Sequence, residues 1–219
     1  MDIDFTHLKH VFIDFDGTLV DSIPMLYQNY ITFLKTFAKT GSREEFEALT
    51  GPTIKEFIPL LAQRHGLENG HDELYDCYIE ELQGTYHAVQ LMPNARVFLE
   101  LLKRLKLPAT LVTSSHLVLI ESSLEHLKLR EYFQTIVTGD MVNRTKPDPE
   151  IYELALKKNH LKPVQALAVE DSYSGSLSAI TANIPTIGLQ QAEHVTLSPQ
   201  VFRVKSWREI IDLFEAAYA

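Results

Sequence analysis

The chain has 219 residues, a length that fits one large domain or one domain with an insert. Its formal net charge is −9, from 20 basic and 29 acidic residues, which argues against nucleic acid or an anionic membrane as the main partner. Cys77 is the single cysteine, so the sequence excludes an internal disulfide and a thiolate zinc cluster.

The N-terminal residues and the later apolar stretches predict neither a signal peptide nor a membrane span. Residues 1–10 mix acidic and basic side chains and have no apolar region of the kind found in signal peptides. No later stretch approaches the roughly 18 apolar residues of a membrane span. We therefore expect a soluble, cytoplasmic protein with no membrane partner, a monomer by default, although a dimer stays open.

The first predicted element is a buried strand at 11–13 that ends in two carboxylates. The stretch is Val11-Phe12-Ile13-Asp14-Phe15-Asp16-Gly17-Thr18. β-Branched and aromatic residues favour the strand, and Gly17 ends it. A carboxylate at such a strand tip is costly to bury without a partner, and ligands of open α/β sheets bind at the carboxyl ends of strands. We therefore expect the chemistry of the chain at residues 14–18.

Residues 21–88 show helical periodicity and no strand signal. Helices are predicted at 23–39, 53–64 and 71–87, and a capping-box pattern from Ser42 to Glu45 opens a short helix between the first two. This pattern predicts an all-helical insert after the first strand.

Strand and helix signals alternate in the remainder of the chain. Strands are predicted at 109–113, 135–137, 166–169, 185–189 and 202–204. Helices are predicted at 97–106, 117–127, 149–159, 174–182 and 207–217. Alternation with short apolar strands predicts an α/β fold, a parallel sheet covered by helices on both faces.

Hydroxyl groups follow the second strand, at Thr113-Ser114-Ser115. One interpretation is helix capping, since serine favours the position before a helix. The other is a ligand site, because the carboxyl ends of parallel strands share one edge of the sheet. The residues themselves leave both open.

Glu170 and Asp171 follow the strand at 166–169, and Lys146 lies in a loop between two turn-forming stretches. Adjacent carboxylates repel each other unless a cation neutralises them, and hard oxygen ligands suit Mg²⁺. A solvated acidic turn is the alternative for the pair, and a surface charge is the alternative for Lys146. Combined with Asp14, Asp16 and a hydroxyl, these groups match phosphoryl transfer through an aspartyl-phosphate.

At this point the chain resembles the haloacid dehalogenase-like superfamily, and more narrowly its phosphoglycolate phosphatase and β-phosphoglucomutase branch. Four stretches carry the resemblance, in the family's order and over most of the chain: 14–22, 112–114, 146–149 and 170–175. The resemblance implies a Rossmann-like core with sheet order 5-4-1-2-3, formed by residues 1–20 and 89–219. It also implies a helical cap inserted at 21–88.

The resemblance also implies catalytic roles. Asp14 would attack phosphorus and form the covalent intermediate. Asp16 would protonate the leaving oxygen and then take a proton from water. Thr113 would hold a phosphoryl oxygen, and Lys146 would pair with Asp14 and the phosphate.

Metal and phosphate ligands follow from the same resemblance. Mg²⁺ would be held by Asp14, the backbone carbonyl of Asp16, and Asp171, with Glu170 bound directly or through water. The implied phosphate-binding residues are Gly17, Thr18, Thr113, Ser114 and Lys146.

The implied reaction is hydrolysis of a small phosphorylated metabolite, such as phosphoglycolate or a sugar phosphate. Asp16 argues against dehalogenase and phosphonate-cleaving members, which lack Asp at that position. A β-phosphoglucomutase-like activity stays open as an alternative, although Leu26 and Ile54 stand where that branch has His and Arg. A receiver-type phosphoacceptor domain and a catalytically silent relative that only binds its ligand also stay open.

Overall fold

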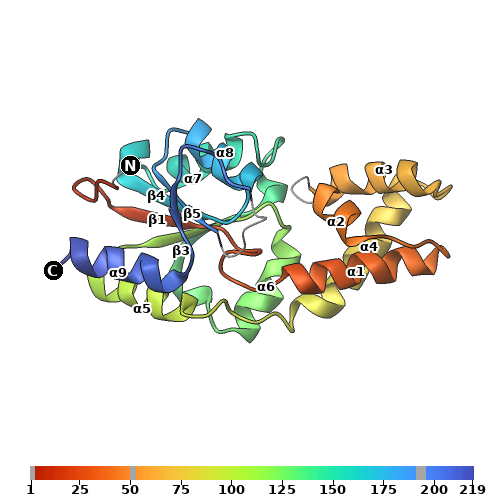
Figure 1. Ribbon diagram of the computed structural model, residues 1–219, viewed down its shortest axis with the longest axis horizontal. Helices are drawn as coiled ribbons and strands as arrows, with labels where there is room; N and C mark the ends of the chain where they lie inside the picture. The colour runs from red at the N-terminus through yellow and green to blue at the C-terminus, as the bar shows by residue number, and fades with distance from the viewer. Residues whose placement is uncertain (1–2, 50–52, 191–195) are drawn as a thin grey trace.

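In a computed structural model, described for residues 3–49, 53–190 and 196–219, the chain forms a parallel sheet flanked by helices (Figure 1). The sheet has six strands in the order β3-β2-β1-β4-β5-β6. The strands are β1 (His10–Ile13), β2 (Ala109–Val112), β3 (Phe133–Val137), β4 (Ala166–Glu170), β5 (Thr186–Leu189) and β6 (Phe202–Val204). The predicted fold and the 5-4-1-2-3 order are confirmed, and β6 extends the sheet beyond β5.

Side chains of the central strand β1 alternate between the two faces of the sheet. Phe12 packs in a cluster with side chains of α7 (Glu150–Lys158) and α8 (Tyr173–Thr181). Val11 and Ile13 belong to the larger core on the other face, with α5 (Ala95–Leu105), α6 (Leu117–His126) and α9 (Trp207–Ala217). Both faces are therefore covered, which explains why β1 is apolar throughout and fully buried.

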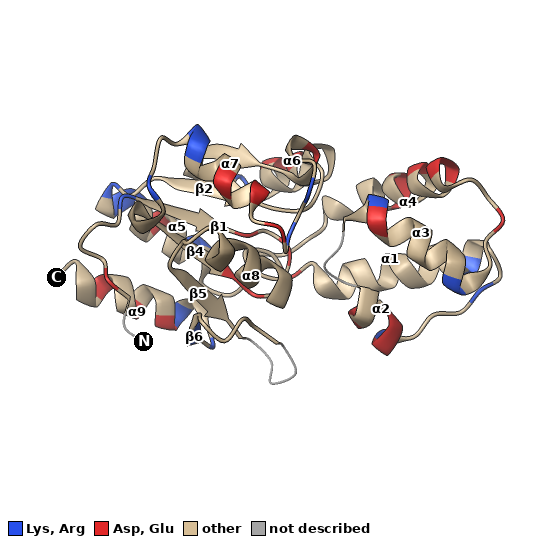
Figure 2. Cartoon of the chain, turned by 90° about the horizontal axis from the view of Figure 1, so that it is seen from above, with Lys and Arg blue, Asp and Glu red and all other residues tan. Residues whose placement is uncertain are grey.

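Four helices follow β1 before the chain returns to the sheet: α1 (Ile23–Thr36), α2 (Arg43–Leu49), α3 (Ile54–His65) and α4 (His71–Tyr86). They lie together at one end of the molecule in both views (Figures 1 and 2). Apolar side chains hold them to one another, among them Tyr30, Phe33, Phe57 and Tyr78. The described part of 21–88 contains no strand, as predicted.

The two connections to this helical group lie side by side. The backbone N–H of Asp21 donates to the carbonyl of Gln90 at 2.9 Å, and Val20 forms an antiparallel bridge with Leu91. The entry and exit of the segment are thereby paired just beyond β1.

The observed elements differ from the predicted ones at their ends. α1 stops at Thr36 rather than residue 39, because Ala38 adopts a positive φ of 55°. Ser42 does accept a hydrogen bond from the N–H of Glu45 at 3.1 Å, but the Glu45 carboxylate binds Tyr30 and His65. Short 3-10 turns at Arg130–Tyr132, Gly139–Met141 and Pro163–Gln165 were not predicted. None of the described helices is long and apolar enough to cross a membrane.

His10 gives the fold a measurable pH dependence. Its side chain is buried, and Nε2 lies 2.7 Å from Oγ1 of Thr110. Burial lowers the pKa of His10 to about 4, below its usual 6.5. The unfolded chain then binds a proton that the folded chain excludes, so this contribution to stability is complete above pH 6.5 and is lost as the pH falls towards 4.

We expect His10→Gln to be less stable than the wild type at pH 7, with a difference that shrinks by about 1 to 2 kcal/mol between pH 7 and pH 5. Urea unfolding of both proteins across this range measures the difference and cancels the titration of the other groups. A difference that stays constant with pH would show that His10 does not titrate on unfolding.

Candidate active site

Asp14 stands at the carboxyl end of the central strand. Its backbone N–H donates to the carbonyl of Val169 in β4 at 3.1 Å, which continues the pairing of β1 with β4 by one residue. The side chain is 6% exposed, and Oδ1 accepts a hydrogen bond from Nζ of Lys146 at 2.6 Å. The nucleophile candidate is thus fixed in place by a buried cation.

Lys146 reaches this point from the loop before α7, and the structure therefore places it inside rather than on the surface. Its Nζ contacts three oxygens: Asp14 Oδ1 at 2.6 Å, Glu170 Oε1 at 2.7 Å and the carbonyl of Val112 at 2.9 Å. Burial alone would lower the pKa of Lys146, but the two carboxylates raise it further than burial lowers it. Lys146 is therefore charged.

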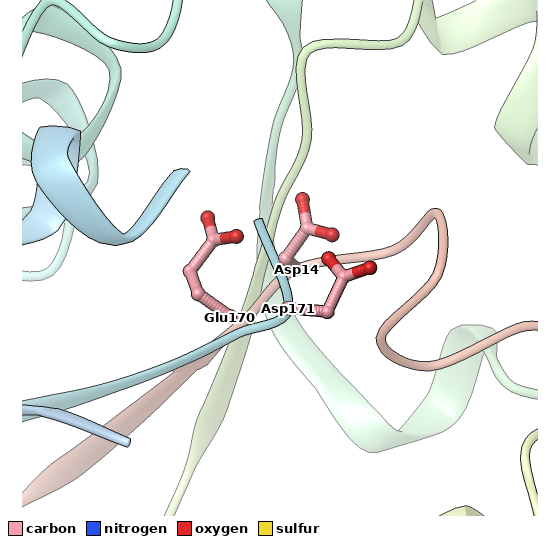
Figure 3. A group of neighbouring side chains, drawn as sticks. All are labelled: Asp14, Glu170 and Asp171. Carbon is pink, nitrogen blue, oxygen red and sulfur yellow. The ribbon is translucent and has the colours of Figure 1, made fainter. Parts of the chain in front are cut away.

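The carboxylates of Asp14, Glu170 and Asp171 lie close together at the carboxyl ends of β1 and β4 (Figure 3). One oxygen from each lies within 4.8 Å of the others. Burial raises the pKa of both Glu170 and Asp171, and repulsion from the Asp14 carboxylate adds to the rise. When all three carboxylates are ionised, they carry more negative charge than Lys146 neutralises.

The donor set of this cluster fits a hard divalent cation. All three donors are carboxylate oxygens, the type that Mg²⁺ prefers. Glu170 Oε1 accepts from Tyr152 at 2.6 Å and from Lys146, whereas the buried Oε2 has no hydrogen-bond partner among the described residues. An unpartnered buried carboxylate oxygen is costly unless a cation or water satisfies it.

Asp16 is held away from the lysine by two hydroxyls. Ser115 Oγ donates to Oδ2 at 2.6 Å, and the hydroxyl of Tyr86 donates to Oδ1 at 2.8 Å. Burial raises the pKa of Asp16, the Ser115 hydrogen bond works against the rise, and the nearby Asp14 charge adds to it. The side chain of Asp16 is outside the three-carboxylate cluster, so its predicted metal contact rests on its backbone carbonyl.

Gly17 and Thr18 pack against the acidic cluster. Gly17 has a φ of +79°, and a Cβ at this position would lie 2.1 Å from Asp171 Oδ2, so glycine allows that carboxylate to approach. Its N–H donates to the carbonyl of Val20 at 2.9 Å. Thr18 Oγ1 donates to Asp171 Oδ1 at 3.0 Å. The family resemblance implies that Gly17 and Thr18 bind phosphate, and that role stays a prediction.

Thr113 and Ser114 follow the end of β2. The backbone N–H of Thr113 donates to the carbonyl of Val137, and its Oγ1 accepts from the N–H of Ser115 at 3.0 Å. Residues 113–115 therefore lie at the carboxyl edge of the sheet beside Asp14, and the Ser115 hydroxyl donates to Asp16. The capping alternative does not describe these contacts, since His116 is the residue that precedes α6.

A cavity of about 530 Å³ opens above these groups, between the sheet edge and helices α1 to α4. Its floor contains Asp14, Asp16, Thr113, Ser114, Ser115, Lys146 and Asp171. Its opposite wall is mainly apolar and includes Ile23, Leu26, Phe46, Leu49, Ile54, Phe57 and Leu82. Arg43 also lines it and pairs with Glu47 at 2.7 Å. A second hollow, of about 480 Å³, lies at the amino ends of β2 and β3, remote from these residues.

Sequence reasoning missed three residues of the site. Tyr86 and Tyr152 come from helices α4 and α7, and each has the pattern of an ordinary apolar position in its helix, because both are buried. Ser115 is visible in the hydroxyl cluster, but its contact with Asp16 is not. The sequence does not show that these hydroxyls pair with Asp16 or Glu170, because the paired residues are 18 to 99 positions apart along the chain.

Comparisons with known proteins agree with this geometry. Residues 11–189 match the family model described as haloacid dehalogenase-like hydrolase. The chain is 28% identical to a phosphorylated carbohydrates phosphatase of Thermotoga maritima over 82% of this chain and 84% of that protein. It is 31% identical to the phosphoglycolate phosphatase of Yersinia pseudotuberculosis over 85% of this chain and 83% of that protein.

A solved structure is also similar in fold. The crystal structure of CbbY from Rhodobacter sphaeroides in complex with phosphate superposes with a TM-score of 0.83, covering 93% of this chain and 96% of the other, at 24% identity.

Proposed function

The chain belongs to the haloacid dehalogenase-like hydrolases and is a phosphatase of small phosphorylated molecules, and on that premise we propose that it acts through a phosphorylated Asp14. One observation carries the proposal. The Asp14 carboxylate lies on the floor of the cavity, fixed by Lys146 at 2.6 Å, while Asp16 is held separately by two hydroxyls.

Two carboxylates in different surroundings can divide the chemistry between them. An oxygen of Asp14 bonds to phosphorus as the bond between phosphorus and the alcohol oxygen breaks, and Asp16 gives its proton to that oxygen. Asp16 then takes a proton from water, which attacks phosphorus and frees Asp14 and inorganic phosphate. Lys146 and Thr113 hold the phosphoryl oxygens, whose negative charge needs positive or donor groups.

Mg²⁺ is the cofactor that the acidic cluster supports. Asp14, Asp171 and the backbone carbonyl of Asp16 would hold it, with Glu170 bound directly or through water. When bound, the ion supplies positive charge that neutralises the carboxylates and the phosphoryl group. The preference of Mg²⁺ for oxygen ligands matches this donor set.

The helical group at 21–88 is proposed as the cap that selects the substrate, with 1–20 and 89–219 as the core. Helices α1, α2, α3 and α4 all supply residues to the cavity wall opposite Asp14. The substrates named for the relatives, phosphoglycolate and phosphorylated carbohydrates, are small metabolites of the kind this cavity could hold.

The cavity argues against the phosphomutase alternative. A mutase has to hold a second phosphate while the first is transferred. Leu26 and Ile54, where the mutase branch has His and Arg, both line this cavity. Besides Lys146, which is assigned to the transferred phosphoryl group, the described cation in the lining is Arg43, and it pairs with Glu47 at 2.7 Å. The receiver domain and the silent relative gain no support from relatives that are named phosphatases.

Removal of divalent metal tests the function and its cofactor together. We expect the purified protein with Mg²⁺ to release phosphate from p-nitrophenyl phosphate and from members of a panel of about a hundred metabolites. EDTA should abolish the release and Mg²⁺ should restore it. Asp171→Asn should raise the Mg²⁺ concentration needed for half-maximal activity by roughly tenfold or more, because it removes a charged ligand. Activity unaffected by EDTA would contradict the metal assignment, and no hydrolysis across the panel would contradict the phosphatase.

A further inference from the structure

The C-terminal end of helix α4 contacts Asp16, the carboxylate that the proposed mechanism uses as acid and base. Tyr86 is the last residue of α4, and its hydroxyl donates to Asp16 Oδ1 at 2.8 Å across 70 residues of sequence. We propose that Tyr86 is a positioning residue that holds Asp16 in line with the leaving oxygen. This inference rests on the proposed function, because it assumes the acid–base role of Asp16.

Each oxygen of Asp16 has a hydroxyl donor, and the side chain of Ser22 lies close to the same carboxylate. Ser115 Oγ donates to Oδ2 at 2.6 Å, while Tyr86 donates to Oδ1. The two hydroxyls are themselves 3.4 Å apart. Donors on both oxygens fix the rotation of a carboxylate as well as its position, which a single donor would leave free.

The tyrosine cannot easily leave this contact. Its side chain is 1% exposed, and its ring belongs to the main apolar core. Its backbone carbonyl accepts a hydrogen bond from Oγ of Ser123 in α6 at 2.6 Å, and Ser123 is itself fully buried. The hydroxyl is therefore presented by a residue that is anchored at both ends.

A hydroxyl suits a carboxyl group that changes protonation during the reaction. It donates to the carboxylate and can accept from the carboxylic acid, whereas a cation would favour the charged form alone. A phenylalanine would remove the Tyr86 donor to Oδ1, and the orientation of the Asp16 carboxyl group would then be fixed less firmly.

The contact also links the proposed cap to the chemistry. Tyr86 is contributed by the helical segment 21–88, whereas Asp16 and Ser115 lie in the core that holds the phosphoryl group. The acid is consequently oriented by both parts of the molecule, and α4 must be docked for its alignment to be complete.

Tyr86→Phe tests the proposal through the leaving group. Benzyl phosphate has a poor leaving group that needs the acid, whereas p-nitrophenyl phosphate, with a ring of the same size, needs little protonation. We expect Tyr86→Phe to lower kcat/KM for benzyl phosphate by roughly 10- to 100-fold, and for p-nitrophenyl phosphate by less than about 3-fold. KM for benzyl phosphate should change little.

Three further variants make the result decisive. Asp16→Asn should show the same preference for the good leaving group, with a larger loss. Ser115→Ala, which removes the donor to the other oxygen, should resemble Tyr86→Phe. Ser123→Ala disturbs the same helix end without touching Asp16, and should change both esters by one common factor.

Two results would overturn the inference, and they are distinguishable. Equal losses for both esters in Tyr86→Phe, with the selective loss retained in Asp16→Asn, would leave Tyr86 a purely structural residue and the proposed function intact. If Asp16→Asn itself shows no dependence on the leaving group, the acid role of Asp16 fails and the role of Tyr86 fails with it.

Discussion

Asp14→Asn is expected to lower phosphate release by roughly 10⁴-fold or more, because an amide cannot attack phosphorus and no other group replaces a covalent nucleophile. The loss should appear in kcat for p-nitrophenyl phosphate and for every ester that the wild type hydrolyses. Asparagine is nearly isosteric and can keep a hydrogen bond to Lys146, so the variant should remain folded, which circular dichroism can verify. Steady-state assays with Mg²⁺ measure the effect.

Asp212→Asn is the matched control for this change. Asp212 is exposed on α9 and pairs with Arg208 at 2.7 Å, outside the cavity lining. Its loss should leave phosphate release within about 2-fold of the wild type, since exposed charge pairs contribute little. Substantial activity in Asp14→Asn would refute the nucleophile assignment.

Lys146→Met should cost both stability and activity. The ammonium group is 4% exposed and holds two carboxylates, Asp14 and Glu170, at 2.6 and 2.7 Å. Methionine fills similar space but leaves those charges without a cation, which costs about 3 to 5 kcal/mol when one partner of a buried pair is removed. Phosphate release should fall by roughly 10²-fold or more, because a charge that stabilises the phosphoryl oxygens is lost.

Lys103→Met provides the comparison for stability. Lys103 forms an exposed pair with Glu131 at 3.2 Å, with both side chains more than 60% exposed. Such pairs contribute about 0 to 1 kcal/mol, so urea unfolding should separate the two variants clearly. If Lys146→Met were as stable and as active as Lys103→Met, the buried cation would have no part in the site.

The core architecture could be predicted because its signals are local. Apolar runs such as 11–13 and 166–169 favour a strand covered on both faces, and the connection between two parallel strands is usually a helix. Asp14 and Asp171 stand out in the sequence because a carboxylate at the end of a buried strand is costly without a partner. Lys146 alone has the pattern of a surface charge, and its combination with those carboxylates gave it a role. Their meeting within a few ångströms follows from the shared edge of the sheet.

The supporting residues of the site could not be predicted for a physical reason. Tyr86 and Tyr152 are aromatic residues on the buried faces of helices, and the sequence pattern of a core tyrosine is the same whether or not its hydroxyl finds a carboxylate. The partner becomes visible only after the helices have packed. Glu45 is a similar case. The spacing of Ser42 and Glu45 predicts a capping box, but the Glu45 carboxylate instead binds Tyr30 and His65.

The covalent intermediate is the most direct test of the central claim that Asp14 accepts the phosphoryl group. Asp16→Asn with p-nitrophenyl phosphate and Mg²⁺ should release one equivalent of nitrophenolate quickly and then slow, because hydrolysis of the intermediate lacks its base. Acid quenching at that moment, followed by peptide mass spectrometry, should find a phosphoryl group on Asp14. Turnover with no phosphorylated peptide at any quench time, or a phosphoryl group on another residue, would contradict the account.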